Sequence, residues 1–184
     1  DRLIASTQKQ GIDTFAPTLP GHGGDADGFC RARPEDWQSC AHDALCDLRA
    51  RYDEIVVVTH SMGGLLALRE TADDPDKIVG LLALALPLRI RVTPACLRLW
   101  LAVGLFPDHI KNPRLAAARD ACSVTGISAR YAFKLMPNAL GLMRLAKRAR
   151  RDIFLSRTPL TALQSPRDEI VSPASAGIAE KAGA

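Results

Sequence analysis

Ser61 is the residue whose surroundings best fit a catalytic role. It lies in Thr59-His60-Ser61-Met62-Gly63, after the β-branched run Ile55 to Val58 and before the apolar run Leu65 to Leu68. This order predicts a strand buried on both faces, a tight turn and a helix, with Ser61 at the tip of the turn. There its hydroxyl is exposed at the carboxyl end of the sheet, and the Met62 N–H and the helix N-terminus can stabilise an oxyanion.

The segment departs at one position from the G-x-S-x-G pattern of a nucleophile elbow, because Thr59 replaces the first glycine. The pattern requires a small side chain there, since strand and helix nearly touch, and threonine is the largest residue expected to fit. A serine beside glycines is also common in ordinary turns. The strand before Ser61 and the helix after it favour an active-site serine.

Asp168 is the candidate acid that would act with Ser61. It lies in the loop after a predicted strand at 159–164. Parallel strands end on one rim of a sheet, so Asp168 is expected on the same rim as Ser61, where the third member of a serine triad belongs. Its neighbour Glu169 is the alternative acid.

No histidine is well placed to be the general base. The chain has four histidines, all before Asp168: His22, His42, His60 and His109. We expect His22 to fix a loop rich in proline and glycine. We expect His42 to lie on the outer side of a helix that begins at Pro34 and is anchored to the sheet by Trp37.

Length and composition are those of one globular domain, with 184 residues of which 47% are hydrophobic. The longest apolar stretches, 78–88 and 97–106, are too short to cross a bilayer, which takes about 20 residues. Five scattered cysteines without C-x-x-C spacing predict no metal site, no disulfide framework and a cytoplasmic protein with reduced thiols. We expect no cofactor. The first residues read as the middle of a helix, so the sequence leaves open whether a signal peptide precedes them.

Strands and helices alternate through the first half of the chain. A helix at 2–10 ends at Gly11, strands are predicted at 12–16, 55–58 and 78–85, and helices lie between them. This alternation predicts an α/β fold with a mostly parallel sheet and helices on both faces. The segment 87–157 has no clear strand. We therefore predict a core at 1–86, a helical cap at 87–157 and a second part of the core at 158–184.

The predicted cap is strongly basic. Between Lys111 and Arg157 there are eleven lysines and arginines against Asp120 and Asp152, a net charge of +9. A nucleic-acid site would have aromatic or glycine residues within the basic run, and these are absent, so we predict no nucleic-acid partner. We expect a solvated helical face first and a weak membrane-surface contact second.

Four blocks of the sequence resemble the α/β-hydrolase superfamily, and within it the bacterial carboxylesterases and monoacylglycerol lipases. They are Ala16–Gly23, Pro34–Trp37, His60–Gly64 and Arg167–Val171. The resemblance implies an α/β-hydrolase-type fold with a helical cap. It also implies that Ser61 is the nucleophile, Asp168 the acid that orients a histidine, and Met62 the donor of one oxyanion-hole N–H.

Two parts of the family's site have no counterpart in this sequence. In the family the base histidine follows the aspartate, and a second oxyanion donor comes from a loop after an earlier strand. We therefore expect the chain to be a fragment, incomplete at both ends. A serine without its base is a weak nucleophile, so the chain alone should be nearly inactive.

The predicted activity is the hydrolysis of carboxylic esters, of a small molecule or a lipid, through an acyl-enzyme on Ser61. A thioesterase or acyltransferase on the same scaffold is one alternative. A non-catalytic α/β-hydrolase-like domain is another, which the missing histidine favours and the pairing of Ser61 with Asp168 disfavours. The sequence does not indicate the oligomeric state.

Overall fold

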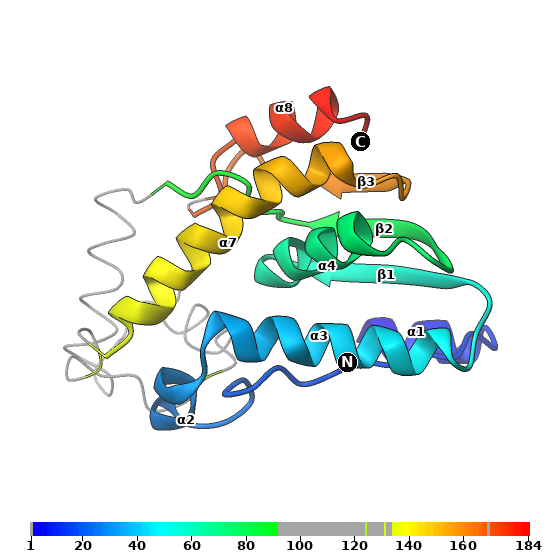
Figure 1. Cartoon of the computed structure of the whole chain (residues 1–184), viewed down its shortest axis with the longest axis horizontal. Helices are drawn as coiled ribbons and strands as arrows, with labels where there is room; N and C mark the ends of the chain where they lie inside the picture. Colours follow the sequence, from blue (N-terminus) through cyan, green and yellow to red (C-terminus); the bar gives the residue numbers. More distant parts are fainter. Residues whose placement is uncertain (1, 92–123, 125–130, 132–133, 169) are drawn as a thin grey trace.

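The computed structural model describes residues 2–91, 124, 131, 134–168 and 170–184, and Figure 1 shows their arrangement. The strands predicted at 55–58, 78–85 and 159–164 are confirmed, as is the helix that begins at Pro34. The described elements, in chain order, are α1 (Arg2–Lys9), α2 (Ala26–Arg31), α3 (Pro34–Arg49), β1 (Ile55–His60), α4 (Met62–Asp73), β2 (Ile78–Leu84), α7 (Met136–Leu155), β3 (Leu160–Leu163) and α8 (Ala174–Lys181).

The three described strands form one parallel sheet in the order β1-β2-β3. Val58 lies opposite Leu82, and Leu82 lies opposite Thr161, so β2 is the central strand. Because the strands run in the same direction, all three end at one edge of the sheet, which we call the carboxyl edge. Loops after β1 and β3 therefore begin at the same edge, on either side of β2.

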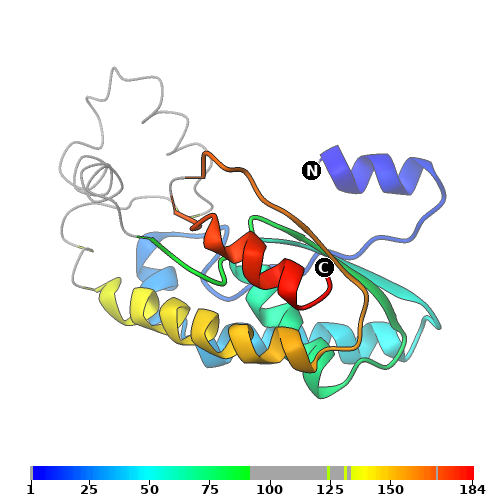
Figure 2. The ribbon, with the colours of Figure 1, turned by 90° about the horizontal axis from the view of Figure 1, so that it is seen from above.

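One face of the sheet is covered by helices (Figures 1 and 2). The main core joins α4 to inward residues of β2, with Leu65 and Leu68 of α4 packed near Leu81 and Ala83. Trp37 of α3 belongs to the same core and is 1% exposed, as the sequence predicts for an anchor. A fully buried leucine contributes about 1.5–3 kcal/mol, so this layer supplies much of the stability that holds α4 on the sheet.

The prediction that β1 is buried on both faces is wrong. Its residues alternate between more and less exposed, and Val56 and Val58 are 64% and 44% exposed. Leu163 of β3 is also exposed, at 55%. The core cluster takes the other face, and successive side chains of a strand point to opposite faces. No described helix packs over these valines, so β-branched residues in sequence do not by themselves mean two covered faces.

The segment from Ile12 to Ala16, predicted as a strand, is irregular. A strand forms by sharing backbone hydrogen bonds with a neighbour, and the described sheet has no strand paired with this segment. Ile12 and Phe15 are accordingly exposed. The helix before it is confirmed, and Gly11 follows that helix with a φ of +75°, the left-handed conformation of a C-terminal cap.

α7, which falls in the predicted cap segment, packs against α4. Leu145, Ala149 and Ile153 are buried in the main core and form the apolar side of this helix. The division of the chain into core and cap stays a prediction. In the part of the chain described, no helix is long and apolar enough to cross a membrane.

Candidate active site

Ser61 occupies a sharp turn between β1 and α4. Its φ of 52° and ψ of −120° lie outside the regions that residues with a Cβ normally adopt. The turn is fixed from both sides, because the Ser61 N–H donates to the Leu84 carbonyl at 2.9 Å and its own carbonyl accepts from the Gly64 N–H at 3.0 Å. The strand, turn and helix expected from the sequence are present, and the strain is of the kind found at functional sites.

The close approach of strand and helix falls at Gly64. A Cβ placed there would lie 2.6 Å from Cδ1 of Leu86 and 3.3 Å from Oγ1 of Thr59. At Gly63 the nearest atom would be the Thr59 Cβ, at an ordinary 3.7 Å. The Thr59 hydroxyl donates to the Leu82 carbonyl at 3.3 Å. A threonine thus fits in place of the pattern's first glycine because its hydroxyl bonds across to β2.

Met62 is the first residue of α4 and is half-buried. The first N–H groups of a helix have no acceptor within the helix, so the Met62 N–H is of the kind that can bind an oxyanion. The first turn of α4 holds no acidic residue. The positive end of the helix dipole is therefore not neutralised by its own side chains beside Ser61.

Asp168 lies in the loop after β3, at the carboxyl edge of the sheet. Its Oδ1 accepts hydrogen bonds from the backbone N–H groups of Ile170 and Val171 at 2.9 and 2.8 Å. Its carbonyl accepts one from the Arg91 guanidinium at 2.7 Å. These bonds fix the carboxyl group in one orientation, with Oδ2 3.5 Å from the Gln164 amide. The alternative acid, Glu169, lies outside the described residues.

The described residues include no hydrogen bond from a histidine to Ser61 or Asp168. His60 precedes Ser61 at the end of β1 and is exposed. His109 lies outside the described residues. Among the residues described, no group of three or more histidines, cysteines and acids could hold a metal ion.

His22 has the loop-fixing contacts predicted for it. Its ring meets those of Phe29 and Trp37 edge to face, with centroids 5.1 and 5.8 Å apart. The Trp37 indole N–H donates to the Pro20 carbonyl at 2.9 Å and ties the same loop to α3. Gly21 next to it has a φ of +78°, and a Cβ there would lie 2.7 Å from the Phe29 Cα. This loop is packed around His22.

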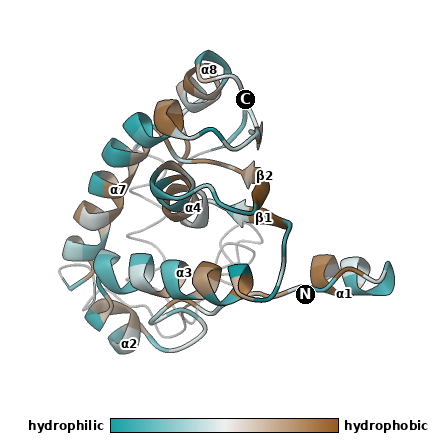
Figure 3. Cartoon of the chain, turned by 45° about the vertical axis from the view of Figure 1, so that its right-hand side comes forward, coloured by the Kyte–Doolittle hydropathy of each residue, from teal (hydrophilic) through white to brown (hydrophobic). Residues whose placement is uncertain are grey.

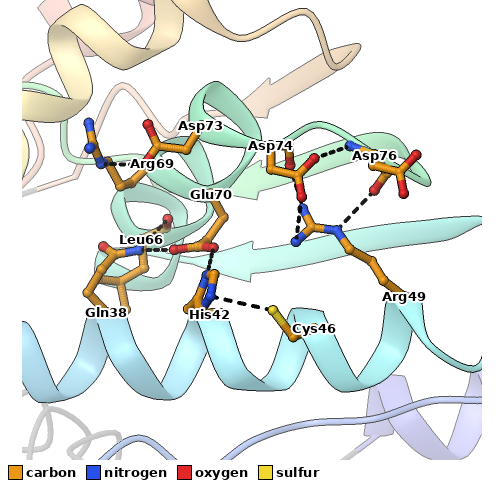
Figure 4. Close-up of polar contacts among 10 residues, drawn as sticks. All are labelled: Gln38, His42, Cys46, Arg49, Leu66, Arg69, Glu70, Asp73, Asp74 and Asp76. Carbon is orange, nitrogen blue, oxygen red and sulfur yellow. Dashed lines mark hydrogen bonds and ion pairs between the residues drawn. The ribbon is translucent and has the colours of Figure 1, made fainter.

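His42 was expected on the outer side of α3, and this is wrong in part. Its ring is largely exposed, but Nδ1 lies 2.9 Å from Oε2 of Glu70 on α4 (Figure 4). The hydrogen bond to Glu70 and its charge raise the pKa of His42. Gln38 donates to the other oxygen of the same buried carboxylate at 2.6 Å. The sequence contains no local signal for this contact, because its partners lie on two separate helices.

The His42–Glu70 pair is too far along α4 to serve Ser61. Glu70 is nine residues beyond Ser61, which corresponds to about 13 Å of helix. The pair therefore joins α3 to α4 and does not supply a base for the turn.

The comparison with protein families decides the wider relationship. The model of the alpha/beta hydrolase family matches residues 1–180, nearly the whole chain. The chain belongs to this family. The comparison with curated proteins found no match.

Solved structures similar to this hydrolase include lipolytic enzymes. One is a structure described with LipS and LipT, two metagenome-derived lipolytic enzymes, with a TM-score of 0.70, 20% identity, and coverage of 98% of this chain and 72% of that one. A second is the monoacylglycerol lipase of Paleococcus ferrophilus, with a TM-score of 0.66, 20% identity and coverage of 98% and 73%. A third is NosK from Streptomyces actuosus, with a TM-score of 0.55, 21% identity, and coverage of 98% of this chain and 75% of that one. At these identities the likeness establishes the fold.

Proposed function

We propose that this alpha/beta hydrolase cleaves carboxylic esters through an acyl-enzyme on Ser61. The observation that carries the proposal is the strained Ser61 turn at the N-terminus of α4, with an anchored acid, Asp168, at the same edge of the sheet. The lipolytic enzymes among the similar structures support a small-molecule or lipid ester as the substrate. Because the five cysteines are scattered without the spacing of a disulfide framework, we place the protein in the cytoplasm.

The reaction would proceed in two halves. Ser61 Oγ attacks the ester carbonyl, its proton passes to a base, and the carbonyl oxygen becomes an oxyanion bound by the Met62 N–H. The alcohol leaves with a proton, and water then attacks the acyl-serine and releases the acid. Asp168 would hold an imidazole in the orientation that lets it carry these protons. That imidazole is not among the described contacts of Ser61.

A thioesterase or acyltransferase would use the same serine and the same oxyanion donor, and differs in the leaving group or the acceptor. A non-catalytic domain would keep the turn without the reaction. The packing of Gly64 against Leu86 and Thr59 is compatible with a catalytic or a non-catalytic domain, whereas the strain at Ser61 favours a hydroxyl that reacts, because such strain clusters at functional sites.

A fluorophosphonate probe followed by mass mapping tests the proposal. With imidazole added as a soluble base, we expect the label on Ser61, slower labelling in Asp168→Asn, and unchanged labelling in the control Ser6→Ala, which alters an exposed serine of α1. Modification of Ser165 with Ser61 intact would contradict the assignment. Absence of labelling at every serine would favour the non-catalytic domain.

Ester turnover with added imidazole separates a missing base from a missing site. Loss of one triad member lowers the rate by orders of magnitude, and a soluble base can restore part of it. We expect slow hydrolysis of a short-chain nitrophenyl ester that rises with imidazole in the wild type and does not exceed the solution rate in Ser61→Ala. Fast turnover without imidazole would mean that His22, His42, His60 or His109 acts as the base. It would overturn the expectation that the chain alone is nearly inactive.

A further inference from the structure

The outward side of α7 carries a line of apolar side chains. Met136, Leu140 and Met143 succeed one another at helical spacing, and Phe154 continues the line after a gap of about three turns. The exposed fractions are 46% for Met143 and 57% for Phe154, and Leu155 beside it is 65% exposed. Single exposed apolar residues are ordinary, but a line of them along one helix indicates a contact surface.

Basic side chains fill the gap in this line and lie along one flank. The exposed basic residues of α7 are Arg144, Lys147, Arg148 and Arg151. The helix has one acid, Asp152, which is 4% exposed and therefore on the buried side, where it pairs with Arg69 of α4 at 3.6 Å. Every exposed charge on α7 is positive.

The opposite side of α7 is the one packed on the core, through Leu145, Ala149 and Ile153. The apolar line, Lys147 and Arg151 thus face away from the described core, whereas Arg148 lines a pocket with residues of α3 and α4. α7 lies along the edge of the fold in both Figure 2 and Figure 3, and Figure 1 shows its N-terminal end on the side where the strands end. With 20 residues it is about 30 Å long, enough to lie along a flat surface.

We propose that the outward face of α7, from Met136 to Leu155, docks the protein on anionic lipid membranes. An apolar line with lysine and arginine beside it is the composition of helices that lie in a membrane interface. Met143 and Phe154 enter the boundary of headgroups and acyl chains, and Lys147 and Arg151 meet lipid phosphates. The charges on the helix suit a surface of one sign better than a protein partner with charges of both signs. The proposal is independent of the ester-hydrolase assignment.

Vesicle co-sedimentation tests this docking surface. With vesicles of equal parts phosphatidylglycerol and phosphatidylcholine, we expect binding that weakens as salt rises to physiological strength but persists there, because the apolar contact is not screened. Lys147→Gln with Arg151→Gln should weaken binding about 30-fold at low salt. The matched control is Lys9→Gln with Lys181→Gln, which removes two exposed charges on α1 and α8 and should leave binding within about twofold.

Met143→Gln with Phe154→Gln separates insertion from simple charge attraction. We expect it to weaken binding at least tenfold at every salt concentration, with an unchanged circular dichroism spectrum, because both side chains are exposed. Equal losses in the control pair, or no sedimentation with anionic vesicles at low salt, would overturn the proposal. So would a dimer in analytical ultracentrifugation that the Met143→Gln and Phe154→Gln pair dissociates, since the surface would then bind a second copy of the chain.

Discussion

Replacing Ser61 with glycine should stabilise the protein while it removes the nucleophile. A residue with a Cβ held in a sparsely populated backbone region costs on the order of 1–3 kcal/mol, and Ser61 has a φ of 52° and a ψ of −120°. Glycine adopts such angles freely but loses about 0.5–1 kcal/mol more than alanine in backbone entropy on folding. Ser61→Gly should therefore be about 0.5–2 kcal/mol more stable than Ser61→Ala, which keeps the Cβ.

Urea unfolding followed by circular dichroism measures this difference, and the two variants form a clean pair because both lack the hydroxyl. A matched pair at Ser39, an exposed position inside α3, should give the opposite sign, with Ser39→Gly about 1 kcal/mol less stable than Ser39→Ala. Neither Ser61 variant should react with a fluorophosphonate. If Ser61→Ala proved as stable as Ser61→Gly, the turn would hold no strain and the reasoning from its backbone angles would be refuted.

Two further substitutions test the packing and the electrostatics around α4. Gly64→Ala should destabilise the protein by about 1–2 kcal/mol in urea unfolding, because its Cβ would lie 2.6 Å from the Leu86 side chain, whereas Gly63→Ala meets ordinary contacts and should be neutral or slightly stabilising. Equal effects at both glycines would contradict the close approach. Glu70→Gln should lower the pKa of His42, followed by NMR titration of the ring. Because Glu70 raises that pKa above 6.5, the pair's stabilisation is complete at lower pH and is lost as pH rises through the raised value, so wild type and variant should converge in stability at alkaline pH.

The elements around Ser61 could be predicted because their signals are local. β-branched residues, a tight turn and two glycines stand within ten positions, and each describes its own part of the strand, turn and helix. The parallel sheet followed from the alternation of such segments, and the position of Asp168 followed from the parallel sheet. In this part of the chain, local preference and overall fold agree.

The failures of prediction all concern contacts between distant segments. Whether Val56 is buried depends on what packs over the sheet, and the run of valines carries no information about that. Whether Ile12 to Ala16 forms a strand depends on a neighbour to pair with. The bond from His42 to Glu70 joins residues 28 positions apart, and neither belongs to a motif. Similarly, composition showed the basic charge of α7, but only its packing on α4 showed that Met143 and Phe154 share the exposed side.

The outward valines of β1 make the colloidal behaviour of the chain depend on residues that do little for its fold. The run Ile55 to Val58 lies at the edge of the described sheet with Val56 and Val58 exposed, and such an edge is a template for pairing with another molecule. Asp53 and Glu54 stand immediately before it and are exposed. When two copies of the run align in parallel, these carboxylates meet and repel, so they act as gatekeepers against aggregation. Substitution of these two acids should therefore lower the yield of soluble protein more than it lowers the stability of the folded state.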